Sequence, residues 1–279
     1  MRAFTAFILI TVLAFPAFAA EKESAYDRVM KTQTIRCGYG TSKPWIYKDA
    51  ADGEMKGFYV DVMNEVAAEL GFKLVWPEET GWGNLPESLK NGRVDVACST
   101  MWLDPIRGKQ AAFTRPLFYT PLYAYSRAGD PRFSGRVTMD FLNNPDIRIV
   151  VLEGDISNNV AMRLFPRAKL IVLPGLASVA EYLMNVTMGK ADVAVLDSIS
   201  VSDFNKSQEK KLKKIALLRP ISISGNALAV GIHDLELREV LNTAIQHLLD
   251  SGKMKDMVDK FEQEYPDSLV MPAGTYGDE

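Results

Sequence analysis

The chain has 279 residues, of which 47% are hydrophobic and 24% are charged, and its formal net charge at pH 7 is -3. This length predicts about two domains with their own cores, while the hydrophobic content and the near balance of charge argue against a disordered chain and against a nucleic-acid-binding protein. Two cysteines and two histidines are too few for a disulfide scaffold or a zinc cluster, so we expect no metal and no cofactor.

The N-terminus has the pattern of a secretory signal peptide. A basic start is followed by an apolar run that ends in Ala17-Phe18-Ala19, with small residues at the -3 and -1 positions of a cleavage site. A membrane anchor is the alternative, but Pro16 interrupts the run, which is shorter than the roughly 20 apolar residues that cross a bilayer. We predict cleavage after Ala19, removal of residues 1–19 and export to the periplasm.

The first part of the mature chain alternates strands and helices. Apolar residues recur at helical spacing from Phe58 to Leu70, and Gly71 ends this helix. A second helix begins near Asn84 and ends at Gly92, where a glycine suits a left-handed cap. Apolar runs predict the strands of this part at 34–38, 72–76 and 94–98.

A second part repeats this order. The segment Gly92-Arg93-Val94-Asp95-Val96-Ala97 resembles Gly189-Lys190-Ala191-Asp192-Val193-Ala194 at an offset of 97 residues, 189 minus 92. Its predicted elements are a strand at 147–152, a helix at 157–164, a strand at 169–173, a helix at 178–188 and the strand after Gly189. Alternation of this kind predicts two consecutive α/β lobes, each with a mainly parallel sheet flanked by helices.

The C-terminal part is too short for a third lobe. It contains a predicted strand at 226–231 and predicted helices at 236–250 and 254–265, which must dock on one of the two lobes. The lysines between 210 and 214 are predicted to form a solvated face.

Cys37 and Cys98 each lie in an apolar, strand-like run. In an oxidising compartment they can form a disulfide if the two strands are neighbours. Free cysteine is also among the most buried residue types, so two separate buried thiols are the simpler alternative. Both alternatives stay open at this point.

Signatures of enzymes are mostly absent. Gly38-Tyr39-Gly40 begins a glycine pattern, but Lys43 stands in place of its last glycine, so the dinucleotide fingerprint fails. The sequence contains no P-loop, no nucleophile elbow and no zinc-protease motif. We therefore predict that the protein is not an enzyme.

The repeat predicts where a ligand binds. In open parallel sheets, ligands bind beyond the carboxyl ends of the strands. Those ends carry Thr100 in the first lobe and Asp197 in the second, and the offset of 97 makes the two positions equivalent. If the lobes face each other, a hydroxyl group and a carboxylate line one cleft.

Loops and strand ends near these positions supply further candidates. Ser157 opens a helix whose free N–H groups suit an anionic group. Tryptophans suit apolar, sugar or cationic ligands, although core packing is their alternative role. These further candidates are Tyr39, Trp45, Trp82, Trp102, Asp155 and Ser157.

One segment has a motif that points to a family. Lys56-Gly57-Phe58-Tyr59-Val60-Asp61-Val62, followed by Leu70-Gly71-Phe72, resembles the G-F-x-x-D-[LV] opening of family 3 extracellular solute-binding proteins, the amino-acid-type binding proteins of ABC importers. The resemblance extends from about Thr34 to about Tyr265. It continues in order through Trp82–Leu85, Leu89–Asp95, Asp104–Lys109 and Phe113–Pro116.

The resemblance implies a two-lobed fold of the type II periplasmic-binding-protein kind with a two-crossover hinge. The crossovers fall near Arg127–Asp130 and Arg219–Gly225, and the C-terminal part returns to the first lobe. The expected boundaries are 30–126 and 225–269 for the first lobe, 127–224 for the second lobe with its hinge segments, and 270–279 for a tail.

The resemblance also implies roles for single residues. Arg107 matches the arginine that pairs with a ligand carboxylate, a task that suits its planar fork. Trp82 matches an aromatic residue that stacks on the ligand, Asp197 matches the acid that holds an α-ammonium group, and Thr100 lines the same pocket.

Three departures from the family pattern bear on the ligand. Trp102 stands where a Thr or Ser usually helps to hold the carboxylate, Tyr39-Gly40 replaces a stretch that often carries an aspartate, and Asp155 replaces part of a Gly-Thr pair. An additional aromatic ring and an additional acid suit a cationic or N-methylated ligand.

We therefore expect a monomeric periplasmic protein that captures a small polar, amino-acid-like ligand and delivers it to an inner-membrane ABC permease. One alternative is a cyclohexadienyl dehydratase, since a few proteins resembling this family are such enzymes. Its acid or base would be Asp197, Asp155 or Asp104. The other alternative is a ligand-sensing partner of a membrane receptor.

Overall fold

The computed structural model describes residues 23–80, 84–103, 105, 107–153, 156–175 and 177–272, apart from the side chains of Thr100 and Ile156. The predicted signal peptide, Trp82 and Asp155 lie outside the described residues. The elements are α1 (Ala25–Thr32), β1 (Thr34–Tyr39), β2 (Tyr47–Lys48), β3 (Met55–Lys56), α2 (Phe58–Leu70), β4 (Lys73–Glu79), α3 (Leu85–Lys90), β5 (Val96–Trp102), η1 (Arg107–Lys109), β6 (Ala111–Phe113), β7 (Phe118–Arg127), η2 (Pro131–Phe133), α4 (Met139–Leu142), β8 (Arg148–Leu152), α5 (Ile156–Leu164), β9 (Lys169–Leu173), α6 (Val179–Thr187), β10 (Val193–Leu196), α7 (Ser198–Ser207), β11 (Leu212–Lys214), β12 (Ser222–Gly231), α8 (Leu235–Asp250) and α9 (Lys253–Glu264).

The main sheet is mixed and continuous. Its strand order is β4-β1-β5-β12-β7-β10-β8-β9, with β6 paired to β12 and β11 paired to β7. The strands β4-β1-β5 are parallel, and so are β10-β8-β9, as the sequence predicts for each part. The prediction of two separate sheets needs correction, because the long antiparallel strands β7 and β12 join the two parallel groups into one sheet.

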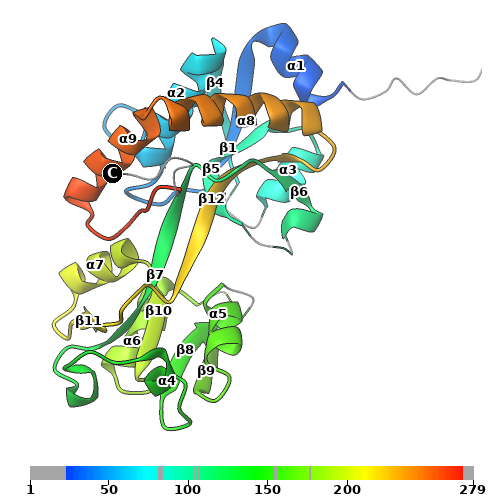
Figure 1. Ribbon diagram of the computed structural model, residues 1–279. Helices are drawn as coiled ribbons and strands as arrows, with labels where there is room; N and C mark the ends of the chain where they lie inside the picture. Colours follow the sequence, from blue (N-terminus) through cyan, green and yellow to red (C-terminus); the bar gives the residue numbers. More distant parts are fainter. Residues whose placement is uncertain are drawn as a thin grey trace, which may run out of the picture.

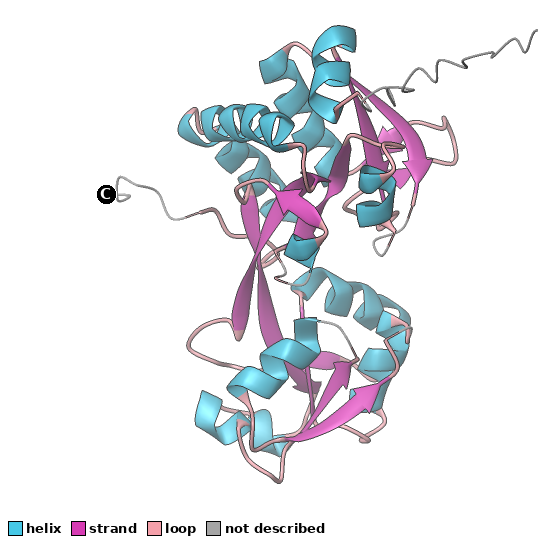
Figure 2. Cartoon of the chain, turned by 90° about the vertical axis from the view of Figure 1, so that its right-hand side faces the viewer, coloured by secondary structure: helices cyan, strands magenta, loops and turns pink. Residues whose placement is uncertain are grey.

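The helices gather around the two ends of this sheet (Figure 1). We call the upper half β1–β6 with η1, α1–α3, α8 and α9, and the lower half β8–β11 with η2 and α4–α7. The strands β7 and β12 run from one half to the other, and a view from the side shows them as the long connection between the halves (Figure 2). They pair directly over residues 118–122 and 222–226.

Each half has its own buried hydrophobic residues. Phe118 of β7 packs in a core cluster of the upper half that includes Val62 of α2 and Leu241 of α8. Leu122, four positions later on the same strand, packs in a cluster of the lower half with Ile149 of β8. The chain therefore passes from one core to the other between Phe118 and Leu122. The C-terminal helices α8 and α9 pack on the upper half, as the resemblance implies.

The sequence repeat marks the same local structure in each half. Gly92, with a φ of 67°, follows α3, and Gly189, with a φ of 76°, follows α6. Both have the left-handed backbone that glycine adopts without a steric cost, as predicted for these helix ends. Each glycine is followed three positions later by a buried aspartate, Asp95 or Asp192.

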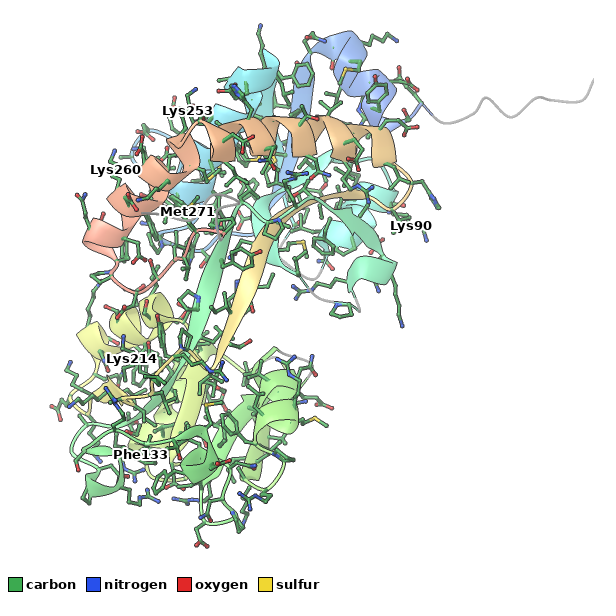
Figure 3. The ribbon with its side chains drawn as sticks, in the orientation of Figure 1. Lys90, Phe133, Lys214, Lys253, Lys260 and Met271 are labelled. Carbon is green, nitrogen blue, oxygen red and sulfur yellow. A yellow bond between two sulfur atoms is a disulfide. The ribbon has the colours of Figure 1, made fainter. Side chains whose placement is uncertain are left out.

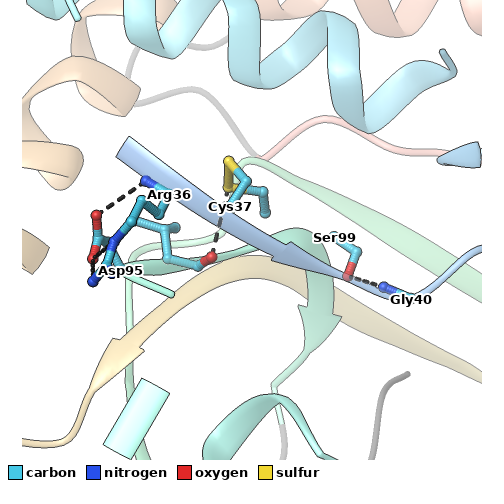
Figure 4. Close-up of a disulfide and its surroundings, with 7 residues drawn as sticks. Arg36, Cys37, Gly40, Asp95 and Ser99 are labelled. Carbon is cyan, nitrogen blue, oxygen red and sulfur yellow. Dashed lines mark hydrogen bonds and ion pairs between the residues drawn. A yellow bond between two sulfur atoms is a disulfide. The ribbon is translucent and has the colours of Figure 1, made fainter. Parts of the chain in front are cut away.

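Each of these two aspartates binds an arginine on the first parallel strand of its half, β1 or β8. Asp95 accepts hydrogen bonds from the backbone N–H of Arg36 at 3.0 Å and from its Nη2 at 2.8 Å (Figure 4). Asp192 accepts from the backbone N–H of Arg148 at 2.9 Å and from its Nη2 at 2.8 Å. Charge-assisted bonds of this kind satisfy a buried carboxylate, so the aspartate of the repeat has a structural role in both halves.

Cys37 and Cys98 form a disulfide between β1 and β5, with an S–S distance of 2.01 Å and a Cα–Cα distance of 5.3 Å (Figure 4). Both residues are fully buried. The two strands are parallel neighbours, with Cys37 opposite Val96, which brings the cysteines within reach of each other. Of the two alternatives left open by the sequence, two separate thiols is therefore wrong.

Removing this disulfide should destabilise the fold. The bond closes a loop with a sequence separation of 61 residues, and loops of this size are restricted in the unfolded chain when they are cross-linked. We expect the double variant Cys37→Ala/Cys98→Ala to lose about 2–4 kcal/mol of unfolding free energy in urea titration. Reduction of the native protein under unfolding conditions should produce the same loss. An equal stability of variant and oxidised native protein would contradict this prediction.

Candidate functional site

The carboxyl ends of β1 and β5 are held together at one edge of the upper half. The backbone N–H of Gly40 donates to the hydroxyl oxygen of Ser99 at 3.3 Å, and Ser99 is fully buried (Figure 4). Thr100, at the predicted strand end, is the next residue of β5, which continues for two more residues, to Trp102; the side chain of Thr100 is outside the described residues. Downstream of β5, Arg107 is half-buried in the short helix η1.

Asp197 follows the last residue of β10, in the lower half, as the repeat predicts. Its carboxylate caps α7, because Oδ1 accepts from the backbone N–H of Ser200 at 2.9 Å and Oδ2 accepts from the Ser200 hydroxyl at 2.8 Å. Burial raises the pKa of Asp197 above its ordinary value, and the bonds from Ser200 oppose this shift. Backbone N–H groups at the start of α7, those of Asp197 and Ile199, also favour the ionised carboxylate.

Ser157 lies in the first turn of α5, directly after β8. It is buried, and its hydroxyl oxygen accepts a hydrogen bond from the backbone N–H of Leu152 at 3.3 Å. This bond fixes the start of α5 to the end of β8. In Figure 1 the beginning of α5 lies on the side of the lower half that is turned toward η1 of the upper half.

The candidate residues are thus divided between the two halves. The end of β5 is level with Phe118 of β7, because Trp102 pairs with Asn226 of β12 and Asn226 pairs with Phe118. The end of β10 is level with Tyr123 of β7, because Leu196 pairs with Tyr123. At about 3.3 Å per residue, the five steps along β7 from Phe118 to Tyr123 span about 17 Å. The ends of β5 and β10 are therefore about 17 Å apart along β7, one in each half.

Trp102 contacts both halves. It is half-buried and packs against the hydrophobic core of the lower half, although its strand belongs to the upper half. Nothing in the local sequence distinguishes such a contact from a side chain that faces solvent, since it depends on strands far away in the chain.

Tyr39 and Trp45, two further predicted site residues, pack against aromatic rings of the upper half. Tyr39 is buried in the core of the upper half, with its ring edge-to-face against Trp76 at 5.8 Å. Trp45 stacks on Tyr59 at 5.2 Å and lies 5.1 Å from the ring of Phe261. Aromatic pairs at these separations are favourable in cores, so the packing role is the one observed for Trp45.

The two strands that run between the halves, β7 and β12, are called the crossing strands here. They contain polar groups that the sequence did not identify as candidate site residues. The side-chain amide of Asn226 donates to the hydroxyl oxygen of Thr120 at 2.9 Å, and both residues are buried. Thr120 lies on β7 and Asn226 on β12, so this bond ties the two strands where they pass between the halves. An asparagine directly before the apolar run Ala227–Val230 was the available signal.

Comparison with known proteins places the chain in a family. The sequence profile described as bacterial extracellular solute-binding proteins, family 3, matches residues 35–264. The chain belongs to this family. Within its described residues, no helix is both long and apolar enough to cross a membrane, and no three His, Cys, Asp or Glu side chains gather in a group suited to a metal ion.

Relatives within this family include binding proteins of amino-acid transporters. A probable amino-acid ABC transporter-binding protein of Haemophilus influenzae is 30% identical over 255 residues, covering 89% of this chain and 90% of the relative. An L-arginine-binding protein of Pseudomonas aeruginosa is 27% identical over 267 residues, covering 91% and 93%. The crystal structure of an ancestral amino acid-binding protein, a precursor of cyclohexadienyl dehydratase, matches with a TM-score of 0.64 and 25% identity, covering 85% of this chain and 99% of that one.

Proposed function

We propose that this solute-binding protein is the amino-acid-binding component of an ABC transporter and that it binds its ligand between the upper and lower halves, without chemistry. The observation that carries the proposal is the division of the candidate residues. Arg107 and the strand end with Thr100 belong to the upper half, whereas Asp197 and Ser157 belong to the lower half. A ligand that contacts both sets favours the arrangement in which the halves are close.

Two charged groups on opposite halves are suited to a zwitterion. The guanidinium of Arg107 is a planar donor that fits a carboxylate. The buried carboxylate of Asp197 is an acceptor that suits an ammonium group. We propose that Arg107 binds the α-carboxylate and Asp197 the α-ammonium group, with Thr100 and Trp82 lining the same pocket.

The two halves act as lobes in this proposal, with the boundaries 30–126, 127–224 and 225–269. Hinge motion requires segments that absorb a change in backbone angles at the connection. The paired segments 118–122 of β7 and 222–226 of β12 form this connection. A hinge in segment 118–122 would lie earlier in the chain than the predicted crossover at Arg127–Asp130. Hydrogen exchange of the backbone amides, measured with and without ligand, distinguishes the two locations.

Export to the periplasm is part of the proposal. Export would place the disulfide between Cys37 and Cys98 in an oxidising compartment, where such bonds persist. The signal peptide is predicted to be cleaved after Ala19. Mass spectrometry of the mature protein tests the cleavage site, and an N-terminus other than Ala20 would show that cleavage occurs elsewhere.

We propose a cationic or N-methylated amino acid as the ligand, because Trp102 and Asp155 depart from the family pattern and a relative is named for arginine binding. Calorimetry with L-arginine, L-lysine, glycine betaine and L-glutamine should give the tightest binding with one of the two cationic members or with N-methylated glycine betaine. Trp102→Ser should reduce this preference several-fold, and Trp102→Phe should keep most of it. Tightest binding of L-glutamine to the native protein would contradict the assignment.

A second candidate function is favoured by the likeness to the precursor of cyclohexadienyl dehydratase. Dehydration requires a group that gives or takes a proton in the site. Asp197 has the raised pKa of a buried acid, and Asp155 and Asp104 are the further candidates. Incubation with prephenate or arogenate decides between the functions, since turnover that is lost in Asp197→Asn would support the enzyme.

A further inference from the structure

The segment after α9 connects the upper half to β7. Tyr119 and Val270 exchange two backbone hydrogen bonds of 2.8 Å, so the chain pairs with the second residue of β7. We call residues 265–270 the C-terminal strap. Because Tyr119 lies in the part of β7 that pairs with β12, the strap runs along the connection between the halves.

The strap is anchored firmly to the upper half. The carboxylate of Glu262, on α9, accepts hydrogen bonds from the backbone N–H groups of Asp267 at 3.1 Å, Ser268 at 2.6 Å and Leu269 at 2.6 Å. Ser268 and Leu269 are buried. Charged acceptors make the stronger hydrogen bonds, so the strap moves with α9.

The same strap contacts the lower half at two points. Lys214 of β11 forms an ion pair with Asp267, and its Nζ lies 4.5 Å from the ring centroid of Tyr123. The hydroxyl of Ser198, the first residue of α7, donates to the carbonyl oxygen of Pro266 at 3.3 Å. The side chains of Lys214 and Asp267 are 40% and 56% exposed, so their pairing is not enforced by burial.

These contacts lie on the other side of β7 and β12 from η1 and α5, which carry Arg107 and Ser157 of the proposed ligand site, whereas Asp197 directly precedes Ser198 of these contacts. In Figure 1, α9, the strap, α7 and β11 are to the left of β7 and β12, whereas η1 and α5 are to the right. Figure 3 shows Lys214 at the top of the lower half, below the strap. If the halves approach each other on the right about the crossing strands, they separate on the left, and the strap contacts are lost.

We propose that Lys214–Asp267 and Ser198–Pro266 form a latch that stabilises the arrangement described here over the closed one and so weakens ligand binding. A contact present in one of two states shifts their populations by its own free energy. The effect on affinity rests on the proposed function, whereas the effect on the separation of the halves does not.

The first test measures the separation of the halves without added ligand. Spin labels on cysteines introduced at Glu87 of α3 and Met162 of α5, which are exposed positions on the two halves, report their distance. Asp267→Asn and Ser198→Ala should each shift the distances toward shorter values. The matched control is Asp259→Asn, which breaks the exposed pair with Lys255 within α9 and should leave the distances unchanged. Distances in Asp267→Asn that equal those of the control would overturn the latch.

The second test measures affinity for L-arginine and L-lysine by calorimetry. Because exposed ion pairs are weak, Asp267→Asn should lower the Kd by about two- to fivefold. Adding Lys214→Gln to this variant should lower it little further, since both changes remove the same contact. If neither amino acid binds, the proposed ligand class fails while the spin-label distances still decide on the latch. A Kd equal to that of Asp259→Asn would contradict the latch alone.

Discussion

Arg107→Ala should weaken the binding of a carboxylate ligand by about 2–5 kcal/mol, which corresponds to a factor of about 30 or more in Kd. Arg107 is half-buried in η1 of the upper half, whereas Asp197 and α5 belong to the lower half. In the closed state its guanidinium would pair with the ligand carboxylate, and its loss leaves that carboxylate desolvated and unpaired. Calorimetry with the best ligand of the panel measures the change.

The control for this variant is Lys109→Ala, which removes an exposed cation from the same short helix. It should change the Kd by less than about threefold, because exposed charges contribute little. Both variants should unfold at the temperature of the native protein. An unchanged Kd in Arg107→Ala would remove this residue from the ligand site.

Asp192→Asn should lower the free energy of unfolding by about 3–5 kcal/mol, because it removes the buried negative charge that pairs with two arginines. The side chain of Asp192 is 1% exposed, and Oδ1 lies 2.8 Å from an Nη2 of both Arg132 and Arg148. An amide in its place cannot accept the same bonds with both of its groups. Urea denaturation at pH 7 measures the loss.

The pH dependence of this loss follows from the pKa of Asp192. Burial alone would raise this pKa, but hydrogen bonds from Arg148 and Arg132 outweigh burial and hold it well below the ordinary value of 3.8. A lowered pKa in the folded state gives stability that is present above pH 3.8 and is lost as the pH falls further. The difference between native protein and Asp192→Asn should therefore shrink under acid conditions.

A matched control is Asp203→Asn, which breaks an exposed ion pair with Lys206 in the same half. Its effect should stay below about 1 kcal/mol at every pH. If Asp192→Asn were no less stable than this control at pH 7, the bonds of Asp192 to the arginines would not contribute to stability.

Helices and strands with clear periodicity were predictable. The bounds of α2 (Phe58–Leu70) and β9 (Lys169–Leu173) agree with those expected, because their apolar spacing is regular and turn residues follow them. The strand β7 was missed, since Pro121 lies in its middle and its neighbours do not alternate. The helix α7 is rich in serine and was missed too, although Asp197 caps it.

For the candidate site, the sequence predicted the position of residues along the backbone but not the direction of their side chains. The repeat locates Asp197 directly after β10, where the structure has it, because strand ends follow from local patterns. The direction of a side chain depends on distant partners, as Tyr39 and Trp45 show by packing in the upper core. The pairing of Cys37 with Cys98 depends in the same way on the order of the strands.

The most direct test of binding between two halves is small-angle X-ray scattering of the ligand-free protein, before and after addition of the amino acid that binds most tightly in calorimetry. If the ligand contacts both halves, its saturation should lower the radius of gyration, and Arg107→Ala should need a correspondingly higher concentration for the same change. A radius of gyration that stays constant while calorimetry shows full occupancy would contradict binding between the halves.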